Sequence, residues 1–256
     1  YLTTLEKDIL GSECEQYIMS TEDLFISNQT YIQNLLSYLD NFFSEVKVYV
    51  FLRDPVEYYR SYQQELVKAR SYITSPYIFK YPIKEVVTAW QNFCETKVIG
   101  YHPDKDSLKV LAEKIGFAFD NFSKNKSPNN SSMSIQQIAL LEKVQRNLYA
   151  DSDNILKIHL KAITQISAPF TTKAELQQWV KPVVYKNHQD DLEWLNSEHD
   201  VNFLNNEYTQ MVKASSSVIA GEQVGVRDVY QVRDENLIEK YESLVIDLLL
   251  KKLVSA

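Results

Sequence analysis

The stretch that most constrains the fold is Lys47–Ala69 (KVYVFLRDPVEYYRSYQQELVKA), in which an apolar run gives way abruptly to a helical pattern. Residues 46–52 are rich in β-branched and aromatic side chains on both faces, which predicts a parallel strand covered on both sides. Asp54 then suits an N-cap, Pro55 the first helical position, and Glu57 the third position of a capping box. A helix is therefore expected to begin at Asp54.

Arg53 and Ser61 are placed to bind an anion at this strand-to-helix junction. Arg53 follows the strand and lies beside a helix N-terminus, where free N–H groups favour negative charge. Ser61 lies seven residues after Asp54, which is two helical turns along the same face. A guanidinium and a hydroxyl can thus converge on one phosphate. The alternative is an Arg that pairs with a nearby carboxylate and a Ser on the helix surface.

The complete pattern resembles the 3′-phosphate-binding motif of the sulfotransferase family: an apolar strand, R-[DN]-P, and a Ser eight residues after the Arg, followed by Tyr62. The resemblance implies that Arg53 and Ser61 hold the 3′-phosphate of the sulfate donor PAPS (3′-phosphoadenosine 5′-phosphosulfate). It also implies a P-loop-type three-layer α/β/α fold with a parallel sheet, and it covers roughly residues 13–150.

A second motif follows Gln16–Ser20 (QYIMS), a short apolar run that predicts a buried strand. A carboxylate just past a strand end lies at the edge where open α/β sheets bind ligands, so Glu22 is a candidate; the alternative is first-turn capping of the next helix. The S-x-E arrangement resembles that of bacterial sulfotransferase-like proteins and implies that Glu22 is the catalytic base. His102, after a predicted strand at 97–101, is an alternative base or simply a turn residue.

Two loops are further candidates. Asp120–Ser134 is polar and on composition is a solvated loop, but several related sulfotransferases carry a similar Asn/Ser-rich loop near the donor's 3′-phosphate. The resemblance therefore implies donor contacts from Asn130 and Ser132. Ser71–Pro82 contains two prolines and four aromatic residues, and is either a lid facing the acceptor or a packed connection.

The remaining sequence is expected to be mostly helical, within one domain whose α/β donor-binding part spans 1–150 and whose helical part spans 151–256. Before residue 150 the predicted helices are 1–12, 29–43, 83–94, 106–115 and one capped by Ser134 with Gln137. After it they are 154–166, 172–185, 189–195, 201–213 and 235–254, with Pro182 expected to kink or end the second. Residues 221–233 are a loop or short strand, in which Arg227 and Arg233 are either anion contacts or surface residues.

Composition excludes some functions. A net charge of −7 argues against a general nucleic-acid binder. No apolar run reaches transmembrane length, and no signal peptide is visible. Two cysteines do not form a disulfide framework, which favours a reducing, cytoplasmic location. The four histidines are scattered among unrelated predicted elements, so no metal site is expected.

The resemblance implies transfer of a sulfuryl group from PAPS to an acceptor hydroxyl, with a carbohydrate acceptor by analogy with related bacterial proteins. The chain departs from the family in one respect: the 5′-phosphosulfate loop expected before the S-x-E strand has no match, and none of the five glycines lies in such a loop. We therefore expect an N-terminally truncated fragment, inactive by itself, of an active enzyme. The alternatives are a non-catalytic sulfotransferase-like nucleotide-binding or interaction domain, or a chance match in another α/β domain.

Overall fold

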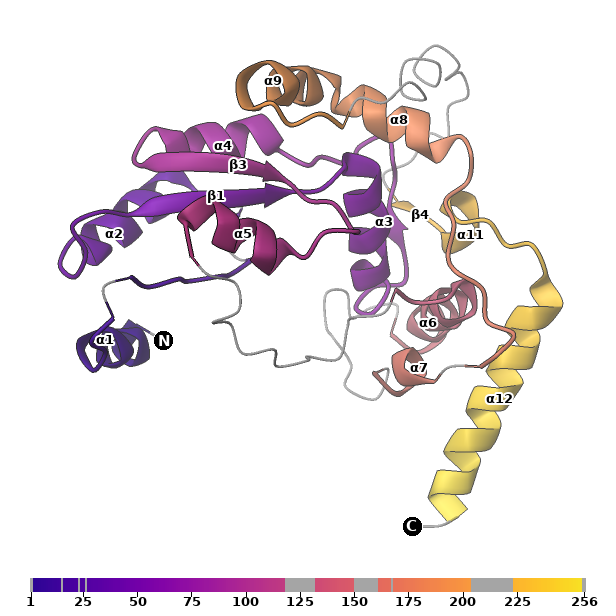
Figure 1. The fold of residues 1–256 in the computed structure, drawn as a ribbon. Helices are drawn as coiled ribbons and strands as arrows, with labels where there is room; N and C mark the ends of the chain where they lie inside the picture. Colours follow the sequence, from indigo (N-terminus) through magenta and orange to yellow (C-terminus); the bar gives the residue numbers. More distant parts are fainter. Residues whose placement is uncertain are drawn as a thin grey trace. The chain divides into compact units, whose positions relative to one another are not determined.

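The computed structural model of the chain has an α/β fold (Figure 1). It describes residues 2–14, 16–22, 24–25, 27–117, 132–149, 161–166, 168–203 and 223–254. The chain divides into two compact units, each assembled from segments that are far apart in the sequence. The first comprises Tyr1–Leu52, Pro82–Phe117 and Trp194–Asn202, and the second comprises the rest. No helix in the described ranges is both long and apolar enough to cross a membrane.

The first unit is built on a parallel pair of strands, β1 (Lys47–Leu52) and β3 (Glu95–Gly100). All six residues of β1 pair in register with the six residues of β3. The strands predicted at 46–52 and 97–101 are both confirmed, and so is their membership of a parallel sheet. Leu52, at the end of β1, is fully buried.

Helices cover both sides of this pair of strands. α2 (Gln29–Leu39) and α4 (Ile83–Gln91) lie on one side, and α5 (Ser107–Ile115) lies on the other (Figure 1). The core on the α2–α4 side consists of Ile32, Leu36, Val86 and Trp90, with Val46 and Val48 packed against it. The apolar residues of α2 and α4 are therefore buried on one face of each helix, as their helical spacing predicts. Both helices end a few residues earlier than predicted.

Gln16–Ser20 does not form the predicted buried strand. The segment lies between α1 (Leu2–Leu10) and α2, belongs to no strand and is exposed throughout, with Ile18 at 48% and Met19 at 45% exposure. A short apolar run becomes a buried strand only if a neighbouring strand offers its backbone and a helix covers its face, and neither condition is visible in its own sequence. Among the described residues, β1 pairs with β3 alone, so α2 does not connect two paired strands.

Where it is described, the second unit is mainly helical and contains one short antiparallel pair of strands. Its helices are α3 (Pro55–Leu66), α6 (Ile135–Leu148), α7 (Lys161–Gln165), α8 (Val180–Asn187), α11 (Val226–Val229) and α12 (Glu235–Val254). Its strands are β2 (Ile73–Thr74) and β4 (Gln223–Val224). α9 (Gln189–His199) begins in the second unit and ends in the first.

α6 carries buried polar side chains that bond to neighbouring backbone. Ser134 and Gln137 form the predicted capping box at its start. The Gln137 amide also donates to the carbonyl oxygens of Ile163, Thr164 and Ile166, at 3.4, 3.0 and 2.9 Å. These carbonyls lie at the end of α7, where helical partners run out, so one side chain satisfies several groups.

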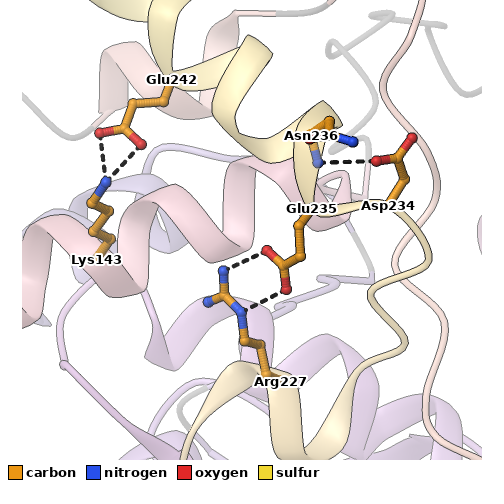
Figure 2. A network of polar contacts seen from close by, with 6 residues as sticks. All are labelled: Lys143, Arg227, Asp234, Glu235, Asn236 and Glu242. Carbon is orange, nitrogen blue, oxygen red and sulfur yellow. Dashed lines mark hydrogen bonds and ion pairs between the residues drawn. The ribbon is translucent and has the colours of Figure 1, made fainter.

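α12 packs along α6 as an amphipathic helix. Its buried stripe consists of Ile238, Tyr241 and Val245. On the exposed side, Lys143 of α6 donates to the carboxylate of Glu242 at 2.7 Å (Figure 2). The helix predicted at 235–254 is therefore confirmed in full.

Arg227 and Arg233 form surface ion pairs. The guanidinium of Arg227 makes two bonds to Glu235, at 3.0 and 2.9 Å (Figure 2), and Arg233 reaches Glu175 at 2.6 Å. Because all four side chains are about half exposed or more, such pairs contribute little to stability. Their partners are carboxylates of this chain, which supports the surface alternative for both arginines.

The helix predicted at 172–185 is wrong in its start and in its end. Residues 171–179 form a connection with two isolated β-bridges, and α8 begins only at Val180 and continues to Asn187. Pro182 does not end α8, because it lies in the first turn, where its missing N–H breaks no helical hydrogen bond. The short strand β4 was one of two alternatives for its segment, and it forms by pairing with β2.

Candidate functional site

The strand-to-helix junction forms where the sequence predicts it. α3 begins at Pro55, and Asp54 is its N-cap: Oδ1 accepts hydrogen bonds from the N–H groups of Val56 (2.8 Å) and Glu57 (3.2 Å). The carboxylate of Glu57 pairs with Arg60 instead of returning to the cap, so the capping box is not completed. Asp54 therefore caps the start of α3 without a return bond from Glu57.

The first turn of α3 offers no N–H group to an external anion. Pro55 lacks an N–H, and the next two residues donate to Asp54, whose carboxylate also offsets the positive end of the helix dipole. The prediction that free N–H groups at this helix start would bind an anion is wrong for that reason. The side chains of Arg53 and Ser61 are the remaining candidate ligands.

Arg53 and Ser61 both belong to the second unit. The Arg53 side chain is exposed, and its backbone N–H donates to the hydroxyl of Tyr81 at 3.4 Å. Ser61 is half-buried on the face of α3 that also carries Asp54 and Tyr58. Seven residues of helix separate Asp54 from Ser61, a rise of ~10 Å, so a side chain as long as Arg is needed to reach towards a ligand of Ser61.

Aromatic rings border this face of α3. The ring of Tyr58 stacks on that of Tyr81 at 4.2 Å between centroids and on that of Tyr62 at 6.0 Å. Phe79 lies about 6 Å from both Tyr58 and Tyr62. Burial raises the pKa of the Tyr81 phenol, so Tyr81 presents a neutral hydroxyl to the backbone of Arg53.

α8 supplies a direct partner for the N-cap. The phenol of Tyr185 donates to Asp54 Oδ2 at 2.7 Å, so both carboxylate oxygens of Asp54 are hydrogen-bonded. Burial raises the pKa of Asp54, while the hydrogen bonds from Tyr185 and from the backbone of α3 oppose that shift. The carboxylate is thus an internal structural group and not an exposed acceptor.

His188, the C-cap of α8, connects the same helix to Tyr81. Its Nε2 accepts the backbone N–H of Tyr81 at 2.8 Å, and its Nδ1 lies 2.6 Å from the carbonyl oxygen of Val184. These partners require a neutral ring with its proton on Nδ1. Burial lowers the pKa of His188, which agrees with a neutral ring.

The predicted base Glu22 lies in the first unit, exposed at a bend, and its carbonyl accepts the N–H of Phe25. It does not follow a strand, because the preceding residues form none. His102 is also in the first unit, exposed two residues after the end of β3, where its carbonyl accepts the N–H of Lys105 in a turn. That geometry fits the turn alternative for His102.

Of the two candidates in the Asn/Ser-rich loop, the structure describes Ser132 but not Asn130. Ser132 is exposed in the second unit, two residues before the N-cap of α6. Asn130 lies outside the described residues. The structure therefore assigns Arg53, Ser61 and Ser132 to one unit, and Glu22 and His102 to the other.

Sequence reasoning missed Tyr81, Tyr185 and His188 as neighbours of the junction. The segment 71–82 is the packed connection rather than an exposed lid, since Ile73, Ser75, Phe79 and Tyr81 are all buried. Its aromatic content was the one available signal. No spacing rule relates Tyr185 to Asp54, because 131 residues separate them.

The first unit holds a separate cavity of about 570 Å³, lined by Thr96–Ile99 of β3, Lys114 and residues 196–200. None of the predicted site residues lines it. Within the described ranges, no group of three or more His, Cys, Asp or Glu side chains is arranged to hold a metal ion. Comparisons of the chain with protein-family models, curated proteins and solved structures found no match.

Proposed function

We propose that the protein is a sulfotransferase-like protein that binds the 3′-phosphate of PAPS through Arg53 and Ser61 and transfers the sulfuryl group to an acceptor hydroxyl. The supporting observation is the junction itself: Arg53 follows the parallel strand β1, Asp54 caps α3, and Ser61 lies two turns along the same helix face. A P-loop-type three-layer fold is part of the proposal, and the parallel strands with helices on both sides support it.

The side chains suit a phosphate monoester. A guanidinium offers several charged donors, and a serine hydroxyl adds a neutral one. The neighbouring carboxylate of Asp54 would compete for the guanidinium if it were exposed, but both of its oxygens already accept hydrogen bonds. Ser132 and Asn130 are proposed as additional donor contacts.

In this proposal Glu22 accepts the proton of the acceptor hydroxyl. The acceptor oxygen forms a bond to sulfur, the bond from sulfur to the 5′-phosphate oxygen breaks, and adenosine 3′,5′-bisphosphate leaves. A positioned general base contributes ~10²–10⁴-fold to the rate of such a step. A carbohydrate is the proposed acceptor, by analogy with the family.

A non-catalytic nucleotide-binding or interaction domain is the second candidate. The observation that favours it is the position of Glu22, which is exposed at a bend and not at the end of a paired strand. A base in such a segment lacks the rigid support that catalysis requires. The phosphate site of Arg53 and Ser61 would be common to both candidates.

Calorimetry with 3′-AMP and 5′-AMP tests the phosphate site, because the two isomers carry the same charge and differ only in where the phosphate lies. We expect the chain to prefer 3′-AMP, Arg53→Ala to weaken binding by ~10–100-fold, and Ser61→Ala by about 2–10-fold. Arg60→Ala is the matched control, since it removes the same charge from the side of α3 and should leave binding unchanged.

Equal binding of the two isomers, or equal losses in Arg53→Ala and Arg60→Ala, would contradict a 3′-phosphate site. The catalytic part needs a separate assay, namely release of adenosine 3′,5′-bisphosphate from PAPS in the presence of carbohydrate acceptors. Turnover that Glu22→Gln abolishes supports the transferase. Nucleotide binding without turnover is the result expected both of the non-catalytic domain and of an inactive fragment of an enzyme, so turnover is the outcome that decides between the two candidates.

A further inference from the structure

The C-terminal end of α8 contacts both Arg53 and Asp54. Tyr185 bonds to Asp54 directly, and the C-cap His188 reaches Arg53 through Tyr81. Tyr185 donates to Asp54 Oδ2 at 2.7 Å. His188 accepts the N–H of Tyr81 at 2.8 Å, and the hydroxyl of Tyr81 accepts the N–H of Arg53 at 3.4 Å. All five residues belong to the second unit, so all of these contacts lie within it.

The hydrogen bond from Tyr185 occupies the carboxylate of Asp54, which is next to the candidate phosphate ligand Arg53. Asp54 Oδ1 is occupied by the N–H groups of α3, and Oδ2 by the phenol of Tyr185, which is 8% exposed. Without that phenol, Oδ2 would be an unsatisfied charged acceptor one residue from Arg53. A carboxylate in that state competes with a phosphate for the same guanidinium. The hydroxyl of Tyr185 therefore prevents the Asp54 carboxylate from occupying the guanidinium of Arg53 in place of a phosphate.

The contact through His188 and Tyr81 fixes the backbone of Arg53. Tyr81 is 3% exposed and its ring is stacked on Tyr58, so its hydroxyl has a defined position. Its backbone is held by Nε2 of His188, which is itself 3% exposed and oriented by the Nδ1 contact to Val184. Nε2 can accept only while the ring is neutral. Protonation of His188 would therefore break the link to Tyr81 and leave two donors facing each other.

We propose that Tyr185 and His188 are positioning residues of the Arg53–Ser61 phosphate site, and that protonation of His188 weakens phosphate binding there. This role rests on the proposed function, since it presupposes that Arg53 and Ser61 bind a phosphate. The charged groups near His188 are Asp54 on α3 and Asp191 on α9, and both favour its protonated form. Burial of the ring opposes them and keeps the imidazole neutral.

Calorimetry of 3′-AMP binding to the full chain tests this role. Tyr185→Phe removes only the hydroxyl, and we expect it to weaken binding by about 3–10-fold near neutral pH, the cost of one hydrogen bond. Tyr241→Phe is the matched control, because Tyr241 is a buried tyrosine of the same unit whose hydroxyl bonds to the Ile163 and Ile166 carbonyls, away from the junction. It should bind 3′-AMP as the wild type does.

The pH profile supplies a readout that a purely structural role would not move. His188→Gln keeps an acceptor for the Tyr81 N–H but cannot titrate, whereas His188→Leu keeps neither property. We expect His188→Gln to bind nearly as the wild type does at neutral pH and to lose less affinity on acidification, and His188→Leu to bind weakly throughout. The phosphate itself titrates with a pKa of about 6, but it does so identically for every variant.

The outcomes separate the two claims. Absence of 3′-AMP binding by the wild type would overturn the phosphate site together with this role. Wild-type binding that is unchanged in Tyr185→Phe, or a pH profile shared by wild type and His188→Gln, would overturn the positioning role and leave the phosphate site standing. Circular dichroism of each variant identifies loss of fold, and Tyr185→Phe and His188→Gln are conservative enough to decide the matter if His188→Leu does not fold.

Discussion

Tyr185 donates a hydrogen bond of 2.7 Å to Asp54, a residue 131 positions earlier in the chain. Asp54 in turn caps α3, so the phenol at the end of α8 supports the start of a helix near the beginning of the same unit. This contact joins α3 and α8, two helices of the second unit. Its removal is accordingly the first test of how the second unit holds together.

Tyr185→Phe should lower the free energy of unfolding by about 1.5–3 kcal/mol, because it removes a hydrogen bond to a charged, partly buried carboxylate. Urea unfolding followed by circular dichroism measures the change. Tyr31→Phe is the control, since Tyr31 is 52% exposed and its loss of a hydroxyl should be neutral. Equal stabilities of the two variants would show that the contact with Asp54 does not stabilise the fold.

Stability should fall on mild acidification because of His188. Its pKa is lowered by burial relative to about 6.5 in the unfolded chain, so between these two values the unfolded chain binds more protons. The contribution is fully present above about pH 6.5 and is lost as the pH falls through the folded-state pKa, at up to ~1.4 kcal/mol per pH unit. Urea unfolding across this range should show a shallower dependence in His188→Gln. His102→Gln, at an exposed position, should match the wild type.

Gly116→Ala should destabilise the first unit by ~1 kcal/mol. Gly116 ends α5 in the left-handed region, at φ 74°, and an alanine there is strained although no atom lies within 4 Å of its Cβ. Gly116→Asn is the informative comparison, because Asn tolerates positive φ better than Ala. Thermal unfolding should rank the glycine first, then Asn, then Ala. If Ala proved as stable as the wild type, backbone strain would not govern this position.

Gln137→Leu should cost about 2–3 kcal/mol of unfolding free energy. The leucine is similar in size, but the substitution leaves the buried Ser134 N–H and the carbonyls at the end of α7 without their donor or acceptor. Gln33→Leu, at an exposed position of α2, serves as the control and should be nearly neutral. Chemical denaturation of both variants checks the difference, and comparable losses would argue that the amide contacts of Gln137 contribute little.

Much of the local structure could be predicted from the sequence. The structure agrees with the predicted strands β1 and β3 and with Asp54 as the N-cap of α3. It also agrees with the capping box at Ser134 and with the end of α5 at Gly116. Each of these depends on residues within a few positions of one another, such as a cap and the N–H groups it satisfies. The start of α8 was not predictable in the same way, because residues 171–179 form bridges to Ser134 and Tyr230 instead of a helical turn.

The strand predicted at Gln16–Ser20 does not form, because its burial depends on parts of the chain outside that segment. Apolar residues indicate that a segment can be buried, but burial of a strand depends on a second strand and a covering helix. The structure supplies neither to this segment, and Glu22 accordingly lies in an exposed bend. The role proposed for Glu22 stays a prediction for the assay with PAPS.

The sequence by itself determined the junction: an apolar strand, Asp54 as a cap and Ser61 two turns along α3, all set by short-range sterics and hydrogen bonds. Only the tertiary structure decided what surrounds it. Tyr185, Tyr81 and His188 reach the junction because α8 and the 71–82 connection pack in the same unit as α3, and packing between distant segments has no signature in local spacing. The same packing leaves both oxygens of Asp54 hydrogen-bonded and the first turn of α3 without a free N–H, so any phosphate bound there would rest on Arg53 and Ser61.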